Sequence, residues 1–554
     1  MTSVSDLHLR KAKPRNGLRG LSVVAVCAAL ICALPMVAVG AAAFGGGTET
    51  VRHLINTVLG EYTRTTLVLV FLVAVGTFSI GVGAAWLVTM TRFPGVRVLE
   101  IALVLPLAFP AYVLAYAYTN VLDHPGIVQT TLRDVMGWGP RDYWFPDIRS
   151  LGGAALMLTL VLYPYVYLLA RAAFLQQSGT TFLAARALGT TAWAAFFKVS
   201  LPLARPAIAG GVLLAVMETI ADFGTVAYFG VQTFATGIYT SWFSLFDRTG
   251  AAQLALCLLS FALLLAMLER AQRGRAKYHD PARQAQRMPP ICLNRGQALC
   301  AQVLCGVPVV FGALLPIVVL FTMGLGSEQN LLSPRYLGFI RNSLTLAGIA
   351  AIVTVGAAVA VGFFQRLSPG KLSRATGYVA RLGYAVPGGV IAVGLMVPFA
   401  VFDNAVDAWM RATFDMSTGL LVTGSIWLLV AAYMVRFLAA ALGAYEGGQA
   451  MVHANMDAAA RSLGQTPIGT LRRVHLPILA PSLLTALLIV FVDVMKELPA
   501  TLIMRPFNFD TLAVQAYRLA SDERLDGAAV PSLVIVAMGL LPVILICRQV
   551  GRAR

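Results

Sequence analysis

Apolar runs of about 20 residues recur from one end of this 554-residue chain to the other. A helix of that length crosses a hydrocarbon layer of ~30 Å, and a bilayer admits few folds other than packed helices or a closed barrel. Hydrophobic residues make up 58% of the chain and charged residues only 12%. The net charge of +17 on so apolar a chain excludes a nucleic-acid-binding domain and a disordered tail, which both need a polar sequence. We therefore expect an all-α integral membrane protein.

Runs bounded by charged or turn residues predict twelve membrane helices, six in each half of the chain. They are expected at about 21–43, 64–90, 99–120, 151–171, 205–224, 250–269, 299–323, 342–364, 382–402, 419–441, 478–497 and 528–547. Because the number is even, both termini are expected on the same side of the membrane.

Lysine and arginine collect in two segments outside these runs and predict the orientation. Residues 1–20 and residues 271–298 are both basic, and cytoplasmic loops carry such an excess. Both are expected in the cytoplasm, with an uncleaved first span. The predicted domains are an N-terminal segment at 1–20, a first membrane domain at 21–270, a linker at 271–298, a second membrane domain at 299–548 and a tail at 549–554.

The two halves share a motif after their fourth predicted span. LAARALGTTAWAAFFKVSLPLARPAI begins at Leu183 and AAARSLGQTPIGTLRRVHLPILAPSLL begins at Ala458, a shift of 275 residues. The Ala-rich start favours a helix that the glycine ends, and Leu-Pro suits the first turn of the next span. An ordinary amphipathic loop explains the alanines and arginines but not the duplicated spacing. The repeat predicts two parallel halves, each with a short cytoplasmic helix joined to a membrane helix.

This motif resembles the E-A-A, three residues, G and later L-P signature of ABC-importer permeases. Longer stretches are similar to the fused two-domain permeases of ferric-iron ABC importers, notably METIADFGTVAYFGVQTFATGIYTSWF at 217–243 and KELPATLIMRPFNFDTLAVQAYRLASDERL at 496–525. The resemblance implies a type I ABC importer permease fold in the bacterial inner membrane. It also implies a separate pair of ATPase subunits, each receiving a coupling helix, and a periplasmic binding protein.

The resemblance carries over to individual residues of the two loops. The implied coupling residues are Ala184, Ala185, Arg186, Leu188, Gly189, Leu201, Pro202, Asp457, Ala459, Ala460, Arg461, Leu463, Gly464, Leu476 and Pro477. The family's glutamate is missing from both copies, where Leu183 and Ala458 stand instead. An acidic contact to the ATPase is therefore expected only from Asp457.

Ionisable residues within the spans are costly, at about 2.5–3.5 kcal/mol each on insertion scales, and call for an explanation. The repeat shift pairs Glu218 with Asp493 and Asp222 with Glu497, and Lys496 lies three residues after Asp493. Carboxylates four residues apart share a helical face, so each half is expected to present a pair. One interpretation is a path that attracts a hard cation such as Fe³⁺. The other is a set of charges at headgroup depth, with Lys496 in a local ion pair.

No enzyme active site is expected on this chain. The phosphate-loop pattern G-x-x-x-x-G-K-[ST] is absent from the sequence, so ATP hydrolysis is assigned to a partner, with no catalytic residue and no cofactor here; metal-binding residues remain open. The predicted function is import of ferric iron. Import of thiamine, a phosphonate or a polyamine, gradient-driven secondary transport, and a receptor or scaffold without transport are the alternatives.

Overall fold

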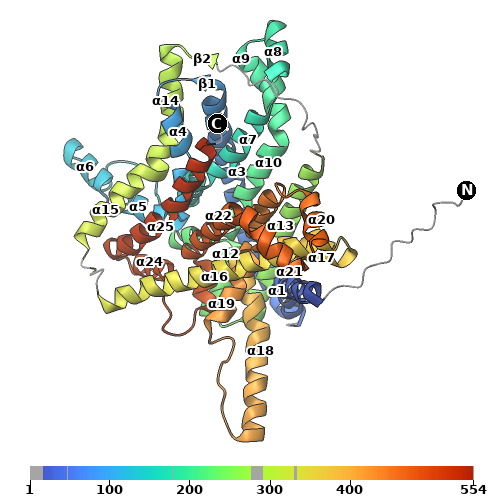
Figure 1. The fold of residues 1–554 in the computed structure, drawn as a ribbon. Helices are drawn as coiled ribbons and strands as arrows, with labels where there is room; N and C mark the ends of the chain where they lie inside the picture. The colour runs from blue at the N-terminus through green and yellow to red at the C-terminus, as the bar shows by residue number, and fades with distance from the viewer. Residues whose placement is uncertain are drawn as a thin grey trace, which may run out of the picture. The chain divides into compact units, whose positions relative to one another are not determined.

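The computed structural model describes residues 16–45, 48–177, 179–275, 291–327, 329 and 333–552. Most of the predicted basic N-terminal segment, residues 276–290 of the predicted linker, and the last two residues lie outside the described residues. The described chain is helical apart from turns and one pair of two-residue strands (Figure 1). The prediction of an all-α membrane protein is confirmed.

Over the described residues, eleven helices are long and apolar enough to cross a membrane, and one bent pair raises the number to twelve. The spanning helices are α1 (Asn16–Gly45), α3 (Leu59–Met90), α7 (Leu151–Gln176), α10 (Leu201–Ala221), α13 (Arg248–Arg275), α14 with α15 (Arg295–Val309 and Leu315–Gly326), α16 (Pro334–Leu367), α18 (Gly388–Phe414), α19 (Ile426–Gln449), α22 (Leu476–Met495) and α25 (Leu525–Arg552). The twelve predicted spans each correspond to one of these elements or to the bent pair.

The third predicted span is not one continuous helix. The first arm of the bent pair is α4 (Val96–Ala102) with η1 (Leu105–Ala108), and the second is α5 (Ala111–Leu122) with α6 (Ile127–Met136). The two arms meet at 95°. Phe109 is extended because the ring of Pro110 disfavours helical geometry in the residue before it. The straight helix expected at 99–120 is therefore wrong.

The ninth span runs further than its apolar sequence suggested. Helix α18 ends at Phe414 rather than near 402, and its polar last turns are tied to the segment that follows. The buried carboxylate of Asp403 accepts hydrogen bonds from the Val422 and Thr423 amides and from the Thr423 hydroxyl at 2.6–3.1 Å. These bonds satisfy a charge that would otherwise end the helix, because a buried carboxylate needs donors.

The described chain divides into two compact units. One contains the described residues of the ranges 1–33, 350–384 and 433–490, and the other contains the described residues of the ranges 34–349, 385–432 and 491–554. The first includes α17 (Lys371–Leu382), α20 (Ala454–Ser462) and α21 (Pro467–Thr470), and the second includes the remaining short helices. The division into two six-helix domains at 21–270 and 299–548 stays a prediction.

Helices α3, α7 and α10 pack closely in the larger unit through small residues. A side chain at Gly81 would lie 2.7 Å from Cβ of Val166, and one at Gly211 would lie 2.8 Å from Cα of the same residue. Glycine at both positions lets the backbones approach, as membrane helices require where lipid offers no hydrophobic drive. This three-helix core fixes the start and the direction of α10. A short parallel ladder between β1 (Thr91–Arg92) and β2 (Ile291–Cys292) joins the end of α3 to the segment before α14.

Each half has an ion pair between the short helix of its third span and the helix of its fourth. In the larger unit, Arg171 of α7 pairs with Glu100 of α4, and both side chains are nearly buried. In the smaller unit, Glu446 of α19 pairs with Arg381 of α17 at a half-exposed site. Arg171 and Glu446 occupy equivalent places under the 275-residue shift, whereas Glu100 and Arg381 do not, because the shift aligns them with Ala375 and Pro106. Each half therefore links the same two elements with the charges on opposite sides, through different positions of the short helix.

Candidate functional site: coupling loops and paired turns

The first coupling loop is a helix, a turn and a second helix that continues into the membrane. Helix α8 (Gly179–Ala187) is followed by Gly189 at φ +85°, then by α9 (Ala192–Ala195) and the π-helical turn η2 (Phe196–Ser200), which leads into α10. The Gly189 amide donates to Arg186 and the Thr190 amide to Ala185, which is a Schellman cap.

The second loop has the same backbone. Helix α20 ends before Gly464 at φ +77°, whose amide donates to Arg461 while the Gln465 amide donates to Ala460. Helix α21 and the π-helical turn η6 (Leu471–His475) then lead into α22. The prediction that glycine ends a short helix in both copies is confirmed, and Leu201–Pro202 and Leu476–Pro477 begin the next span in each.

Aromatic rings hold the first loop against the bundle. The ring of Trp86, at the end of α3, lies 4.3 Å from the ring of Phe196, 5.8 Å from Phe174 and 6.0 Å from Phe182 between centroids. Phe182 belongs to α8 and Phe196 to η2. All four rings are buried, so this aromatic cluster fixes the loop by apolar packing.

Charged groups hold the second loop. The carboxylate of Asp457 in α20 accepts from Arg366 Nε at 2.7 Å and contacts His475 Nε2 at 2.6 Å, while Arg366 also donates to the Val452 carbonyl. Burial opposes ionisation of Asp457, but the hydrogen bonds from Arg366 and His475 outweigh it and hold the pKa of this carboxyl below its ordinary value. Asp457 is only 8% exposed. The structure therefore gives Asp457 the role of positioning α20 within the chain.

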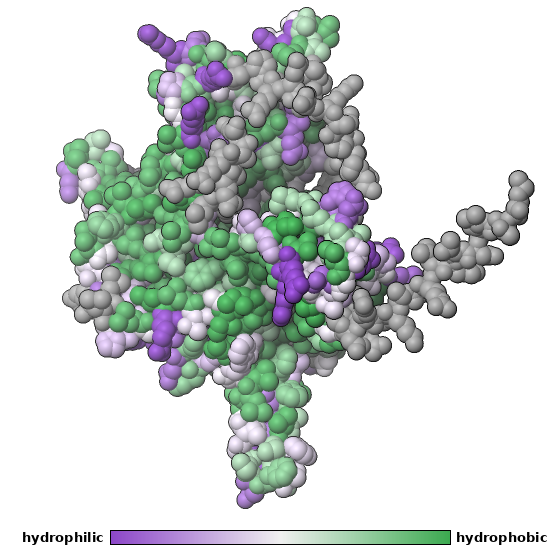
Figure 2. Space-filling model, viewed as in Figure 1, coloured by the Kyte–Doolittle hydropathy of each residue, from purple (hydrophilic) through white to green (hydrophobic). Residues whose placement is uncertain are grey.

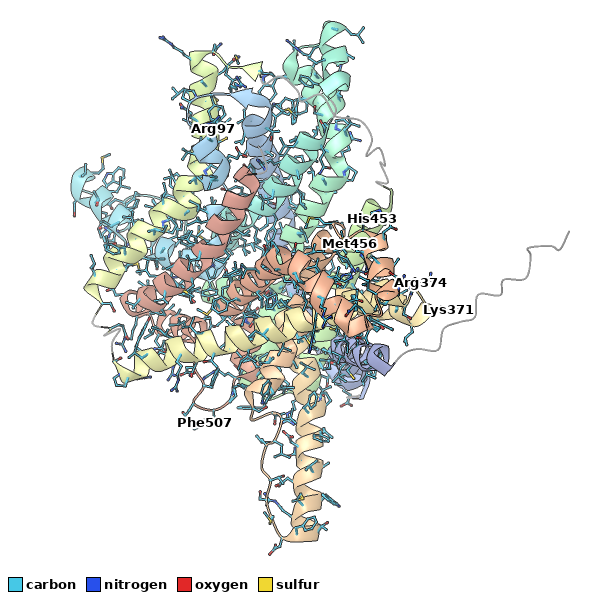
Figure 3. All side chains as sticks on the ribbon, viewed as in Figure 1. Arg97, Lys371, Arg374, His453, Met456 and Phe507 are labelled. Carbon is cyan, nitrogen blue, oxygen red and sulfur yellow. The ribbon has the colours of Figure 1, made fainter. Side chains whose placement is uncertain are left out.

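The tips of the two loops carry equivalent exposed leucines. Leu188 is 86% exposed and Leu463 is 79% exposed, each directly before its capping glycine. Ala184, Arg186, Ala459 and Arg461 are also exposed, whereas Ala460 packs inward and Ala185 is half-buried. In the second loop His453 caps α20 and Met456 lies on its outer surface (Figure 3). Exposed leucines directly before a backbone turn that both loops share are suited to enter a groove on another protein.

At the far end of α10, Asp222 forms a cap for the next helix. Helix α10 ends at Ala221, and the Asp222 carboxylate accepts from the Thr225 and Val226 amides at 3.1 and 3.2 Å and from the Thr225 hydroxyl at 3.0 Å. These donors belong to the first turn of α11 (Gly224–Tyr228), where amides lack helical partners.

Glu497 does the same in the second half. Helix α22 ends at Met495, and the Glu497 carboxylate accepts from the Ala500 and Thr501 amides and the Thr501 hydroxyl at 2.8–3.2 Å in α23 (Pro499–Met504). The expectation that each carboxylate pair shares one helical face is wrong for Asp222 and Glu497, because both helices end before these residues.

The two capped turns meet beside Tyr112 of α5. A side chain at Gly224 would lie 2.8 Å from Tyr112 and 3.0 Å from Leu498, and the Tyr112 hydroxyl donates to the Lys496 carbonyl at 3.4 Å. Turns that are 275 residues apart in sequence thus share one tyrosine. Glu218 and Asp493 lie one turn before the capping residues, and Glu218 is half-buried on α10. Asp493 forms an ion pair with Lys496 at 2.9 Å, as one of the two sequence interpretations expected.

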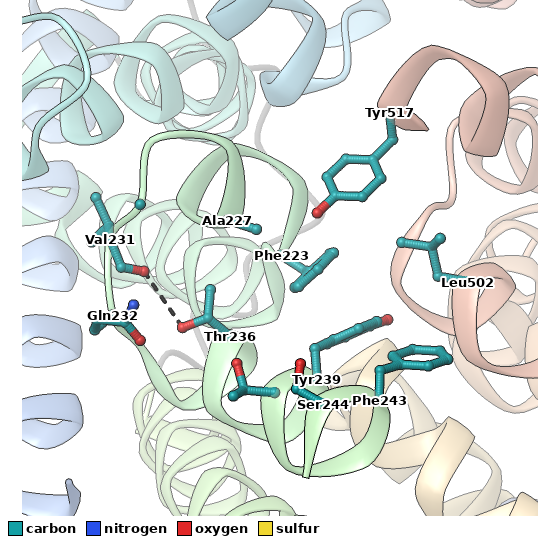
Figure 4. Close-up of a pocket in the computed structure, with 12 residues that line it drawn as sticks. Phe223, Ala227, Val231, Gln232, Thr236, Tyr239, Phe243, Ser244, Leu502 and Tyr517 are labelled. Atoms are coloured by element: carbon teal, nitrogen blue, oxygen red, sulfur yellow. Dashed lines mark hydrogen bonds between the residues drawn. The ribbon is translucent and has the colours of Figure 1, made fainter. Parts of the chain in front are cut away.

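A cavity of about 310 Å³ opens next to these turns (Figure 4). Its walls come from α11, from α12 (Phe234–Tyr239) with the π-helical turn η3 (Thr240–Ser244), from α23 and from α24 (Leu512–Ser521). The ring of Phe223 lies 3.7 Å from Tyr239 and 5.6 Å from Tyr517 between centroids. The Thr236 hydroxyl donates to the Val231 carbonyl at 3.4 Å.

No carboxylate lines this cavity; its surface offers phenols, hydroxyls, an amide and aromatic faces. The predicted carboxylates Asp222 and Glu497 shape its walls by holding α11 and α23. The sequence analysis did not predict this cavity, although the density of rings and hydroxyls in YFGVQTFATGIYTSWF was a usable signal. Among the described residues, no three His, Cys, Asp or Glu side chains are grouped to hold a metal ion.

Sequence comparison identifies the known proteins that this chain resembles. Residues 77–277 match the family described as binding-protein-dependent transport system inner membrane component. The chain is 25% identical to an Fe(3+)-transport system permease protein of Haemophilus influenzae over 513 residues, which cover 90% of this chain and 92% of the relative.

Two further relatives match shorter parts of the chain. The molybdenum transport system permease protein ModB of Escherichia coli is 31% identical over 197 residues, 34% of this chain and 81% of the relative. A putative 2-aminoethylphosphonate transport system permease protein of Salmonella choleraesuis is 26% identical over 268 residues, 46% of this chain and 94% of the relative. Both are about half as long as this chain, which matches the internal repeat.

Proposed function

This chain belongs to the family of binding-protein-dependent inner-membrane transport components, and on that premise we propose that it forms the membrane pathway of an ATP-driven importer of ferric iron. The family is a transport component and not an enzyme. The observation that carries the proposal is the pair of loops with one backbone, each continuous with a membrane helix that ends at the same cavity-forming turns. A separate ATPase pair and a periplasmic binding protein complete the system.

The coupling loops are the proposed docking sites for the ATPase. Leu188 and Leu463 enter its grooves, and the capping glycines keep the tips rigid. The proposal includes an inside location for these loops, for both termini and for the basic segments, following the bias of Lys and Arg. Two loops of the same backbone on one chain call for two ATPase subunits.

Each loop is continuous with a membrane helix, and this continuity defines the proposed path by which movement is transmitted. A displacement of α8 passes through η2 into α10 and reaches the Asp222 cap of α11; a displacement of α20 passes through η6 into α22 and reaches the Glu497 cap of α23. Because both turns contact Tyr112, movement of either α10 or α22 changes the walls of one cavity. ATP binding and hydrolysis would shift the balance between outward-open and inward-open states.

Ferric iron is favoured by the relative that matches almost the full length of the chain. The carboxylates Glu218 and Asp493, one turn before the capping residues, favour a cation over an oxyanion, while the phenols and hydroxyls of the cavity suit either. The molybdenum and 2-aminoethylphosphonate relatives cover single halves and keep another small solute as the alternative; thiamine and polyamines belong to the same test.

Uptake in proteoliposomes tests the substrate. The purified chain is reconstituted with its ATPase and binding protein, and uptake of radioactive Fe³⁺ is followed with ATP inside and the loaded binding protein outside. Iron uptake that needs both supports the proposal, and excess molybdate, 2-aminoethylphosphonate, thiamine or polyamine should not compete. Uptake driven by an ion gradient without ATP would overturn the importer mechanism.

Variants of the loop tips test the coupling role. Leu188→Ala with Leu463→Ala should lower ATPase binding and uptake by at least tenfold, because buried leucines at interfaces contribute about 1.5–3 kcal/mol each. Leu372→Ala removes an equally large exposed leucine from α17, 61% exposed and outside both loops, and should leave uptake unchanged. Equal losses in both variants would remove the docking role.

The carboxylates need a separate pair of variants. Glu218→Gln with Asp493→Asn should abolish uptake while leaving ATPase docking intact if these groups attract the cation. Glu61→Gln neutralises an exposed glutamate at the start of α3 and serves as the control. Normal uptake by the double variant would assign Glu218 and Asp493 to structure alone.

A further inference from the structure

We propose that a cavity at the membrane surface between α16, α24 and α25 binds the phosphate group of an anionic phospholipid. The cavity is about 160 Å³ and lies between the start of α16 and the loop that joins α24 to α25. It is separate from the cavity described above and shares no lining residue with it. The proposal does not depend on which solute the chain transports.

Three arginines give the cavity its charge. Among the described residues that line it are Arg335, Arg518 and Arg524, with one carboxylate, that of Asp522. Asp510 is 3.9 Å from Arg518, at the limit of an ion pair, and Arg335 lies over the ring of Phe339 at 5.8 Å. Guanidinium groups match the oxygens of a phosphate in geometry and charge, so an excess of arginines over carboxylates in the described lining points to an anion.

Two buried polar groups of the cavity find no hydrogen-bond partner among the residues that the structure describes. Tyr336 is 2% exposed and its hydroxyl is unpaired; Gln515 is 7% exposed and its side-chain oxygen is unpaired. Burying such groups without partners is unfavourable. A ligand with both an acceptor and a donor removes that cost: a phosphate oxygen accepts from Tyr336, and a headgroup hydroxyl or ammonium donates to Gln515.

The cavity lies where a lipid headgroup would be. Helix α15 ends at Gly326, α16 begins at Pro334 and α25 begins at Leu525, so three spanning helices have their ends together on the side away from the linker. Apolar residues next to these ends face outward: Leu325 is 73% exposed and Leu337 is 48% exposed. Figure 2 shows hydrophobic residues along α15. Acyl chains can therefore lie on α15 and α16 while the phosphate reaches the arginines.

Native mass spectrometry of the full chain tests this proposal. Protein in nanodiscs of phosphatidylglycerol and phosphatidylcholine is released, and retained lipids are counted. Phosphatidylglycerol should be retained over phosphatidylcholine, which has no headgroup donor for Gln515. Each change of Arg335, Arg518 or Arg524 to Gln should weaken retention about fivefold, the effect of one basic residue near a headgroup. Arg341→Gln removes an exposed arginine of α16 that does not line the cavity and should have no effect.

A variant that keeps the shape of the cavity separates loss of lipid binding from misfolding. Tyr336→Phe removes only the unpaired hydroxyl, so the thermal stability of lipid-free protein should be unchanged or higher, while phosphatidylglycerol retention falls about threefold to tenfold. Titration with inorganic phosphate identifies the source of the ligand. Displacement of lipid by phosphate supports a phosphate site; binding of phosphate with no lipid preference assigns the site to the free ion and overturns the lipid. Retention that is equal in the wild type and the triple arginine variant overturns the site.

Discussion

The two coupling loops have one backbone and two unlike attachments. In the first, Trp86 and three phenylalanines hold α8; in the second, Asp457 with Arg366 and His475 holds α20. Under the repeat shift, Phe182 and Ser200 correspond to Asp457 and His475. Both loops keep the glycine because the turn needs a left-handed backbone conformation. The contacts that hold the helix before the glycine differ, because either aromatic packing or hydrogen-bonded charges can hold it. Asp457 lies one residue before the family's glutamate position, and its charge is used inside the chain.

Loss of the aromatic attachment should lower the stability of the chain more than loss of the charged one. Trp86→Ala removes ring contacts with Phe174, Phe182 and Phe196 and should cost about 4 kcal/mol of unfolding free energy, because the cavity cannot collapse between helices. Thermal unfolding in detergent measures the loss, and hydrogen exchange should show it in residues 182–190. Unchanged exchange there would mean that the ring cluster does not hold α8.

Asp457→Asn should have the next largest effect. It leaves Arg366 without its counter-charge and weakens the contact with the buried His475, and breaking such a partly buried pair costs about 3 kcal/mol. Hydrogen exchange should rise in residues 454–465 and stay constant in 182–190. The triple variant Arg366→Met, Asp457→Leu and His475→Phe replaces the charges with apolar groups and should recover most of the stability. Failure of that recovery would show that the charges do more than position α20.

Acid should separate the two loops without any substitution. The pKa of Asp457 is lowered in the folded chain from an ordinary 3.8, so its contribution is complete above that value and is lost as pH falls through the folded pKa. Protection against exchange, measured relative to the intrinsic rate at each pH, should fall in residues 454–465 below about pH 4, while protection in 182–190, which uncharged rings hold, should not change. The same loss of protection in both loops would indicate general unfolding.

The capping glycines should give the smallest effect, and equal effects in the two loops. Gly189→Ala and Gly464→Ala each force a Cβ into left-handed backbone at a cost of about 1–2 kcal/mol, although open space surrounds both positions. Thermal unfolding of the two variants should agree within about 0.5 kcal/mol. A large difference would show that attachment, and not the turn, determines the rigidity of each tip.

Periodic hydrophobicity and the repeat were enough to predict the spans, with the bent pair counted as the twelfth, and the short helix with its capping glycine in each loop. The break at Phe109 was also readable, since Pro110 follows it, but a continuous apolar run concealed it. The roles of Asp222 and Glu497 were not readable, because sequence spacing cannot show that a helix ends one or two residues before a carboxylate. The attachment of Asp457 to Arg366 joins residues 91 apart, a distance at which no local pattern acts.

The ion pairs between the third and fourth spans have opposite polarity in the two halves, which affects how the halves of a duplicated chain can pair. Glu100 meets Arg171 in one half, and Arg381 meets Glu446 in the other. Had both copies kept the same polarity, α4 could bind α19 as well as its own partner α7. With the polarity reversed, that error brings Glu100 to Glu446, and the reciprocal error brings Arg381 to Arg171. Like-charge repulsion would therefore oppose an exchange of these short helices between the two halves of the chain.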